Sequence, residues 1–126
     1  MYEYKIKEIT HFVDGDTFDC MIDLGFDILH KIRVRMYGMN TPESRTRDLD
    51  EKKRGLESKD KLVELLSPQC EYDHLDFKLV LKTKEKGKFG RWLGIVLKRY
   101  KDDTEIDVNQ LMIEEGYAVP YFGGKR

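Results

Sequence analysis

The sequence predicts an α+β fold that is mainly β: a five-stranded Greek-key barrel of the OB type with two helices. Five segments alternate apolar and polar residues over lengths typical of strands. A long helical pattern separates the third segment from the fourth, and a shorter one follows the fifth. With 126 residues, 40% of them apolar, the chain can fill one core, so a single domain over residues 1–126 is expected. A three-stranded meander with an independent hairpin is the alternative.

The first three strands are predicted from alternation with a period of two. They cover residues 4–12, 17–24 and 29–39, and the Asp-Gly pair within residues 13–16 is a strong signal for a hairpin between the first two. The third strand places its aliphatic residues on one face and both Arg33 and Arg35 on the other. Two cations are therefore expected side by side near the end of this strand.

The first helix is expected to run from a cap at Asp48 to a stop at Ser67-Pro68, with Glu51 completing a capping box. Gly55 should weaken its middle by about 1 kcal/mol. Its predicted apolar stripe consists of Leu49, Leu56, Leu62, Val63 and Leu66.

The second half of the chain predicts two strands and a short helix. The strands cover residues 70–82 and 91–99, and residues 83–88 between them form a flexible basic loop. The helix is capped by Asp107, with Gln110 three residues later, and Gly116 can close it.

The protein is not basic overall, because its 23 Lys and Arg residues are balanced by 24 Asp and Glu residues, which gives a net charge of −1. Any surface that binds an anion must therefore be local. No apolar run approaches the ~18 residues of a membrane span, and the N-terminus lacks an apolar signal segment. We expect a cytoplasmic monomer without a membrane partner, or an intracellular product of a phage or parasite; a mature chain that has lost its signal would look the same.

The cysteines and histidines carry no recognisable site. Cys20 and Cys70 lack CxxC spacing and are expected to be reduced, half-buried thiols. His11, His30 and His74 are scattered without a partner at ligand spacing, which does not favour a zinc site.

A set of polar residues at strand ends and turns favours chemistry over packing. Each has an ordinary explanation alone, since Asp-Gly-Asp is usually only a turn. Together they meet the demands of phosphodiester hydrolysis, which needs a metal or cations to absorb charge and a group to position or deprotonate water. Their hard oxygen ligands favour Ca²⁺ or Mg²⁺ over zinc. The residues are Asp14, Asp16, Arg35, Asn40, Thr41, Glu43 and Arg91.

Three motifs, in order, resemble the staphylococcal nuclease (thermonuclease) family. They are Val13-Asp-Gly-Asp-Thr17, Arg35-Met-Tyr-Gly-Met-Asn-Thr-Pro-Glu43 and Lys88-Phe-Gly-Arg91. A weaker match, Val108-Asn-Gln-Leu and Glu115-Gly-Tyr-Ala118, follows, so that the resemblance covers roughly residues 5–122. Each motif alone is weak, but the ordered set is specific. The family fold is an OB barrel with helices, in agreement with the alternation.

The resemblance implies a role for each motif residue in a Ca²⁺-dependent nuclease that leaves 3′-phosphate ends on DNA or RNA. Asp16 resembles the main metal ligand, and Thr41 resembles the residue that offers its backbone carbonyl. Glu43 resembles the carboxylate that holds the attacking water and is often assigned as general base. Arg35 and Arg91 resemble the arginines that grip the scissile phosphate, which suits a planar guanidinium.

The same resemblance implies a nucleic-acid contact surface. Lys84, Lys86 and Lys88 would approach the backbone of the substrate from their loop. Phe89 stands where the best-known member has a tyrosine that touches a phosphate, so its missing hydroxyl should weaken substrate binding. Tyr121 or Phe122 resembles the aromatic residue near the nucleotide.

Asn40 departs from the family, which usually has aspartate there as a second carboxylate on the metal. An amide oxygen still suits a hard cation, but one negative charge is lost, so a working site with weaker Ca²⁺ affinity, or one open to other divalent ions, is expected. An OB module that binds nucleic acid or protein without turnover is the alternative, although Asp16, Arg35, Glu43 and Arg91 all remain. A small Ca²⁺-binding structural protein is disfavoured because no EF-hand loop is present.

Overall fold

The computed structural model describes residues 2–67, 77–87 and 90–121. The fold is mainly β, with two helices, as the sequence predicts. The elements are β1 (Tyr2–Asp14), β2 (Thr17–Asp23), β3 (Leu29–Met36), β4 (Met39–Asn40), α1 (Leu49–Leu66), β5 (Phe77–Lys86), β6 (Trp92–Tyr100), β7 (Glu105–Asp107), α2 (Val108–Glu114) and β8 (Val119–Pro120).

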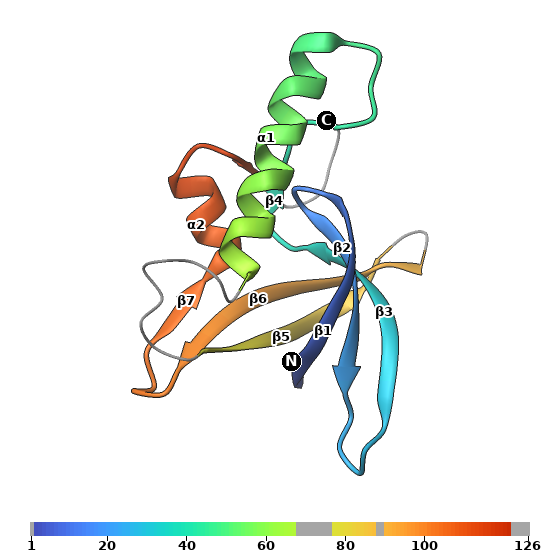
Figure 1. The fold of residues 1–126 in the computed structure, drawn as a ribbon, viewed down its shortest axis with the longest axis vertical. Helices are drawn as coiled ribbons and strands as arrows, with labels where there is room; N and C mark the ends of the chain where they lie inside the picture. Colours follow the sequence, from blue (N-terminus) through green and yellow to red (C-terminus); the bar gives the residue numbers. More distant parts are fainter. Residues whose placement is uncertain (1, 68–76, 88–89, 122–126) are drawn as a thin grey trace.

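Five of the strands close into a barrel, which confirms the predicted OB-type architecture (Figure 1). The sheet order is β3-β2-β1-β5-β6-β7, and an additional pairing between β3 and β6 closes it. That closing pair is parallel and short, joining only residues 34–36 to residues 92–94. The fully buried core inside includes Phe18, Leu81 and Val96. Among the described residues, the barrel is therefore closed through the last three residues of β3.

Three short strands were not predicted from the sequence. β4 pairs with β8, and β7 pairs with the outer edge of β6. The third predicted strand is also divided, because Gly38 takes a positive φ of 79° between β3 and β4. Strands of two or three residues are too short for an alternating pattern to reveal them.

Helix α1 begins as predicted but buries a different face. Asp48 accepts hydrogen bonds from the backbone N–H groups of Asp50 and Glu51, at 3.0 and 3.2 Å. The predicted stripe is wrong at three positions, since these side chains remain 78%, 42% and 38% exposed: Leu49, Leu56 and Val63. The buried face consists of Gly55, Ser58, Leu62 and Leu66. Small residues occupy its first half because that part of the helix lies directly on two loops, described below.

Helix α2 is fixed to the barrel by a buried amide. Asp107 caps the helix as predicted, accepting from the Gln110 N–H at 3.0 Å. Asn109, 4% exposed, accepts from the Val96 N–H at 3.0 Å. Its amide nitrogen donates to the carbonyl of Tyr37 at 2.8 Å. This one side chain therefore joins α2, β6 and the segment that leaves β3.

The predicted basic loop is mostly strand. β5 continues to Lys86, which pairs with Trp92, and a register shift falls between Thr83 and Glu85. The prediction of a flexible loop over residues 83–88 is therefore wrong for residues 83–86. The cause is tertiary, because cross-strand pairing to β6 holds a segment whose charged composition disfavours a strand on its own.

The remaining sequence expectations concern the thiols and the membrane. Cys20 is a free thiol, fully rather than half buried, and its burial raises its pKa to about 12, which makes it a poor nucleophile. Cys70 and His74 lie outside the described residues. No helix in the described part of the chain is long and apolar enough to cross a membrane.

Candidate active site

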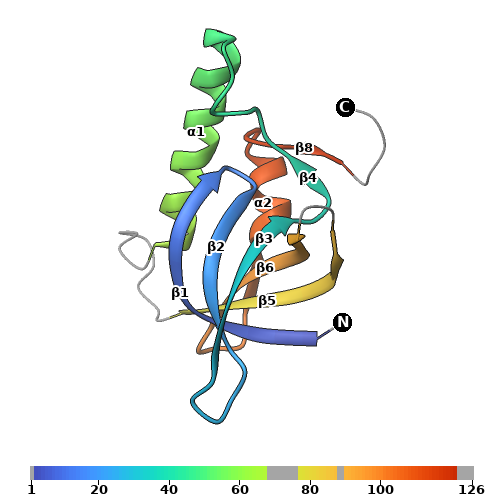
Figure 2. The same ribbon diagram turned by 90° about the vertical axis from the view of Figure 1, so that its right-hand side faces the viewer.

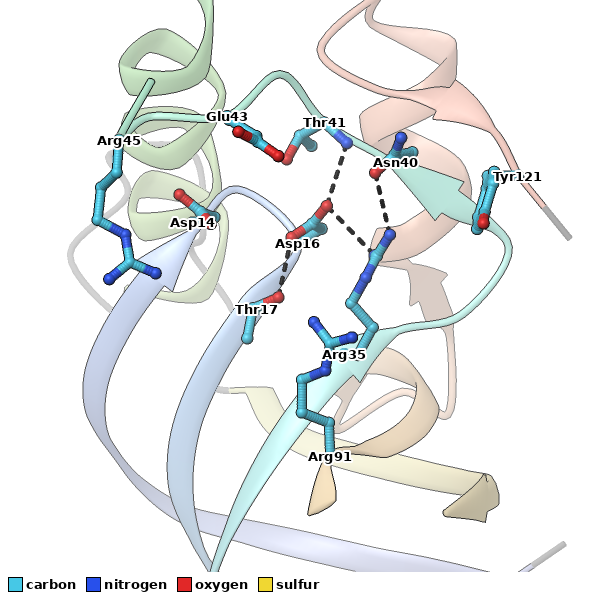
Figure 3. Close-up of a pocket in the computed structure, with 10 residues that line it drawn as sticks. All are labelled: Asp14, Asp16, Thr17, Arg35, Asn40, Thr41, Glu43, Arg45, Arg91 and Tyr121. Atoms are coloured by element: carbon cyan, nitrogen blue, oxygen red, sulfur yellow. Dashed lines mark hydrogen bonds and ion pairs between the residues drawn. The ribbon is translucent and has the colours of Figure 1, made fainter. Parts of the chain in front are cut away.

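A pocket of about 590 Å³ lies at the closed end of the barrel (Figure 3). Side chains reach it from the β1–β2 turn, the end of β3, the loop between β4 and α1, the start of β6 and the segment after β8. Every predicted catalytic and metal-binding residue lines this pocket. The lining residues are Asp14, Asp16, Thr17, Arg35, Asn40, Thr41, Glu43, Arg45, Arg91 and Tyr121.

Asp16 is the buried anion of the pocket, at 4% exposure. One carboxylate oxygen accepts from the Thr17 hydroxyl at 2.9 Å, and the other accepts from the Thr41 N–H at 3.1 Å. The Asp16 carbonyl accepts from the Met36 N–H at 2.8 Å. The β1–β2 turn, the end of β3 and the loop after β4 are thus joined through one residue, which gives the carboxylate a fixed position.

Arg35 lies beside Asp16 and also holds the turn that follows β3. Its guanidinium is 3.2 Å from the Asp16 carboxylate, and the two side chains are 13% and 6% exposed. It donates to the carbonyl of Met39 at 2.9 Å and to the side-chain oxygen of Asn40 at 3.0 Å. Arg35 is therefore a half-buried cation that sets the conformation of the turn as well as the charge of the pocket.

Arg33, expected next to Arg35, lies outside the pocket. Its cross-strand neighbour is Asp19, and Arg33 Nε is 2.7 Å from that carboxylate. The hydrogen bond from Arg33 lowers the pKa of Asp19 below its usual value. The cross-strand neighbour of Arg35 is Thr17, next to Asp16. The partner on β2 therefore decides which of the two arginines contributes to the pocket.

Glu43 is held by the first half of α1. Its backbone N–H is 3.4 Å from a carboxylate oxygen of Glu51. Gly55 passes so close that a Cβ there would lie 2.5 Å from the carbonyl carbon and oxygen of Glu43. The next residue, Ser44, hydrogen-bonds through its hydroxyl to Asp14. Gly55, interpreted from the sequence as a weak point of the helix, is the position that lets the Glu43 loop pack against it.

The β1–β2 turn rests on the same face of α1. A Cβ on Gly15 would lie 2.8 Å from the Ser58 Cβ, so the turn that presents Asp16 touches the helix. Ser58 donates to the Tyr117 carbonyl at 2.7 Å, and Lys61 lies 2.9 Å from the carboxylate of Glu115. The small-residue face of α1 thus sets the relative positions of two carboxylate-bearing loops.

The other predicted contact residues divide into three groups. Arg91 and Tyr121 line the pocket, and Tyr121 is tethered by a 3.0 Å bond from its N–H to the Gly38 carbonyl. Lys84 and Lys86 lie on β5 outside the pocket lining, with their ammonium groups 4.3 Å from the Tyr37 ring centroid and 5.9 Å from that of Trp92. Lys88 and Phe89 lie outside the described residues.

Arg45 was missed by the sequence reasoning. It is exposed, lines the pocket, and extends past Asp14 on the side away from Arg35 (Figure 3). Its position two residues after Glu43 was the available signal, but a charged residue in a loop gives no indication of where its side chain points.

The oxygen atoms of the pocket match the chemistry of a hard cation. The Asp16 carboxylate, the Asn40 amide oxygen and the Thr41 carbonyl belong to residues that line one wall, and such donors suit Ca²⁺ or Mg²⁺. Among the described residues, no three His, Cys, Asp or Glu side chains are grouped closely enough to hold a metal by themselves. An ion here would depend on amide and carbonyl oxygens and on water as well.

Comparison with protein families identifies the chain. A family model described as staphylococcal nuclease homologue matches residues 33–126, about three quarters of the chain. The match contains the Arg35–Glu43 turn, α1 and Arg91, although not the β1–β2 turn that carries Asp16. A comparison with curated proteins finds no match. The protein therefore belongs to the staphylococcal nuclease homologue family, in agreement with its closed barrel and two helices.

Proposed function

We propose that the protein is a Ca²⁺-dependent nuclease that hydrolyses phosphodiester bonds of DNA or RNA. The observation that supports this best is the convergence of Asp16, Arg35, Glu43 and Arg91 on one pocket from separate segments of the chain. Membership of the family makes a nucleic-acid function the natural expectation, and the site argues for turnover because both carboxylates and both arginines are retained.

The acidic side of the pocket would hold the cation. Asp16, Asn40 and the Thr41 carbonyl are the proposed ligands. When bound, Ca²⁺ would polarise the phosphoryl oxygen and neutralise charge on the transferring group. Asp16 is held in place by Thr17, Thr41 and Arg35, and coordination of the ion would replace part of its pairing with Arg35.

The other residues would carry out the proton transfer and absorb charge. Glu43 accepts a proton from a water molecule whose oxygen attacks phosphorus, and the bond to the 5′ oxygen breaks. The products are a 3′-phosphate and a 5′-hydroxyl, which takes up a proton. Arg35 and Arg91 stabilise the charge that develops on the equatorial oxygens, as positioned donors do in other hydrolases. The Gly55 face of α1 supports the step by fixing the Glu43 loop.

The direct test uses purified protein with single-stranded DNA and RNA, each with Ca²⁺ or with chelator. The expected result is cleavage only with the cation, and fragments that carry 3′-phosphate ends. Cleavage in chelator, or 5′-phosphate ends, would contradict the proposed mechanism. Binding without cleavage would instead support the second candidate, a nucleic-acid-binding module, which is favoured by the engagement of Arg35 with Asn40 and with backbone carbonyls of the protein.

Replacing Asn40 with aspartate should tighten Ca²⁺ binding several-fold or more. The substitution adds a carboxylate beside Asp16, and ligand charge is one control on Ca²⁺ affinity. The acceptor for Arg35 is retained, because a carboxylate oxygen can replace the amide oxygen at 3.0 Å. The half-saturating Ca²⁺ concentration for cleavage and for thermal stabilisation measures the change. Gln110→Glu adds the same charge at an exposed site on α2 and should have no effect; equal affinity of Asn40→Asp and wild type would refute the idea.

Replacing Gly55 with alanine should lower kcat by about tenfold or more. Helix propensity alone favours alanine by about 1 kcal/mol, but the new Cβ would meet the Glu43 carbonyl at 2.5 Å. The Glu43 backbone must move, and misplacement of a catalytic group by about 1 Å can cost 10²-fold. Steady-state kinetics and urea unfolding measure the two effects, with Lys53→Ala on the exposed face of α1 as control. Full activity with raised stability would show that the loop is not held by this contact.

A further inference from the structure

A second groove, of about 440 Å³, lies beside the short β3–β6 pair that closes the barrel. Among the described residues, β3 and β6 pair through residues 34–36 and 92–94, so the first half of β3 is not paired with β6. The start of β1 runs beside β5 (Figure 2) and contributes residues to the groove. Three aromatic side chains, Tyr2, Tyr4 and Trp92, line the groove. Its volume falls within the ~300–1,000 Å³ of small-ligand sites, which gives room for a planar ring.

We propose that this groove is a nucleobase-stacking subsite for single-stranded nucleic acid that extends out of the catalytic pocket. The proposal rests on the proposed function for its direction. Arg91 lines the catalytic pocket, and the next residue, Trp92, lines the groove. The two sites are therefore neighbours at the start of β6, and a bound chain that passes both Arg91 and Trp92 would reach both.

The charges around the groove fit a polyanion. No Asp or Glu is among the described residues that line it, whereas Lys84 and His30 are. The Lys84 ammonium lies 4.3 Å from the Tyr37 ring centroid, and the Tyr37 N–H bonds to the Gly94 carbonyl at the β3–β6 junction. Lysines beside aromatic faces are the combination that single-strand-binding proteins use for phosphates and bases. Lys84 does not line the catalytic pocket, and we assign it instead to phosphate binding at this groove.

The ring geometry favours unpaired bases. Tyr2 is 76% exposed, and its ring centroid lies 6.5 Å from that of Tyr4 with the planes tilted by 37°. A base can stack on such a ring only if it has left its own stack, so a duplex cannot use the groove. Every base has a π-face, so the groove selects single strands without reading their sequence. The groove is therefore proposed to bind the unpaired bases of a chain longer than one nucleotide.

The chain contains one tryptophan, so the emission of Trp92 reports on the groove directly. The intact protein is titrated in chelator with an oligothymidylate of about eight nucleotides and with an abasic oligomer of the same length and charge. Fluorescence anisotropy of labelled oligomers gives binding in parallel. We expect saturable quenching of Trp92 emission by the oligothymidylate and no quenching by the abasic oligomer. Because stacking is lost, the abasic oligomer should also bind at least tenfold more weakly.

Two aromatic substitutions provide the matched pair of variants. Tyr2→Ala removes an exposed ring of the groove and should weaken oligothymidylate binding about fivefold or more. Phe26→Ala removes a ring that is 97% exposed at the tip of the β2–β3 hairpin, outside the groove, and should leave binding unchanged. Equal quenching by both oligomers, binding without quenching, no binding, or equal effects of the two variants would each overturn the proposal.

The same protein separates this proposal from the proposed nuclease activity. Cleavage of a dinucleotide in Ca²⁺ depends on the catalytic pocket, whereas quenching in chelator depends on the groove. Base-dependent quenching without dinucleotide cleavage would support the stacking subsite and contradict the nuclease. Dinucleotide cleavage without base-dependent quenching would support the nuclease and contradict the stacking subsite.

Discussion

Replacing Arg35 with alanine should reduce kcat by about 10²-fold or more in saturating Ca²⁺. A guanidinium placed beside the reacting phosphate stabilises charge that is absent from the ground state, and loss of such a donor typically costs this much. The structure adds a second consequence. Asp16, whose side chain is 6% exposed, would lose the cation at 3.2 Å, and removal of one partner of a buried pair costs about 3–5 kcal/mol.

The two consequences of Arg35→Ala can be separated by measurement. Urea unfolding in chelator should show the loss of stability, and Ca²⁺ should recover part of it because the ion can balance Asp16. The loss of kcat should persist at saturating Ca²⁺. Arg33→Ala is the matched control on the same strand, since its guanidinium is bound to Asp19 outside the pocket and is 47% exposed. That variant should keep full activity and lose at most about 1 kcal/mol. Equal kcat losses in both variants would remove Arg35 from the proposed mechanism.

Replacing Glu43 with glutamine should also lower kcat by about 10²-fold or more. Glutamine keeps the size of the side chain but cannot accept a proton from the attacking water, and a general base contributes about 10²–10⁴-fold. The Ca²⁺ concentration that half-saturates thermal stabilisation should change little, because Asp16, Asn40 and Thr41 are the proposed ligands. Loss of activity through loss of Ca²⁺ binding would assign Glu43 to the metal instead.

Glu57→Gln provides the control for Glu43→Gln. Glu57 is an exposed carboxylate on α1 and does not line the catalytic pocket. The substitution removes the same charge from the same region of the protein, so it should leave kcat unchanged. Full activity of Glu43→Gln would end its assignment as the base.

Local patterns in the sequence were sufficient for most of the fold. Alternation gave the strands that close the barrel, and the Asp48 and Asp107 caps lie where predicted. The prediction failed for the buried face of α1, where apolar spacing indicated Leu49 and Leu56 but the helix buries Gly55 and Ser58. Spacing identifies residues that share a face of the helix. The distance from that face to the neighbouring loops determines whether its side chains must be small.

The residues proposed for the site from the sequence line one pocket, and their roles remain predictions. The motifs named Asp16, Arg35, Glu43 and Arg91, and all four line one pocket. Nothing local indicated that Arg35 would bond to Asn40, or that Arg45 would extend into the pocket. These contacts depend on loop conformations that are set by residues elsewhere in the chain.

The sequence by itself determined most of the strand and helix segments, the helix caps and the polar residues of the motifs, because each depends on patterns within a few consecutive residues. The tertiary structure decided which of those residues act together. Arg33 and Arg35 share one face of β3, but Asp19 on β2 binds the first and leaves the second to Asp16. Gly55 acquires its role because α1 packs so closely on the Glu43 loop that a Cβ would lie 2.5 Å from the Glu43 carbonyl. Contacts between segments that are distant in the chain exist only once the fold is complete, so no local pattern can encode them.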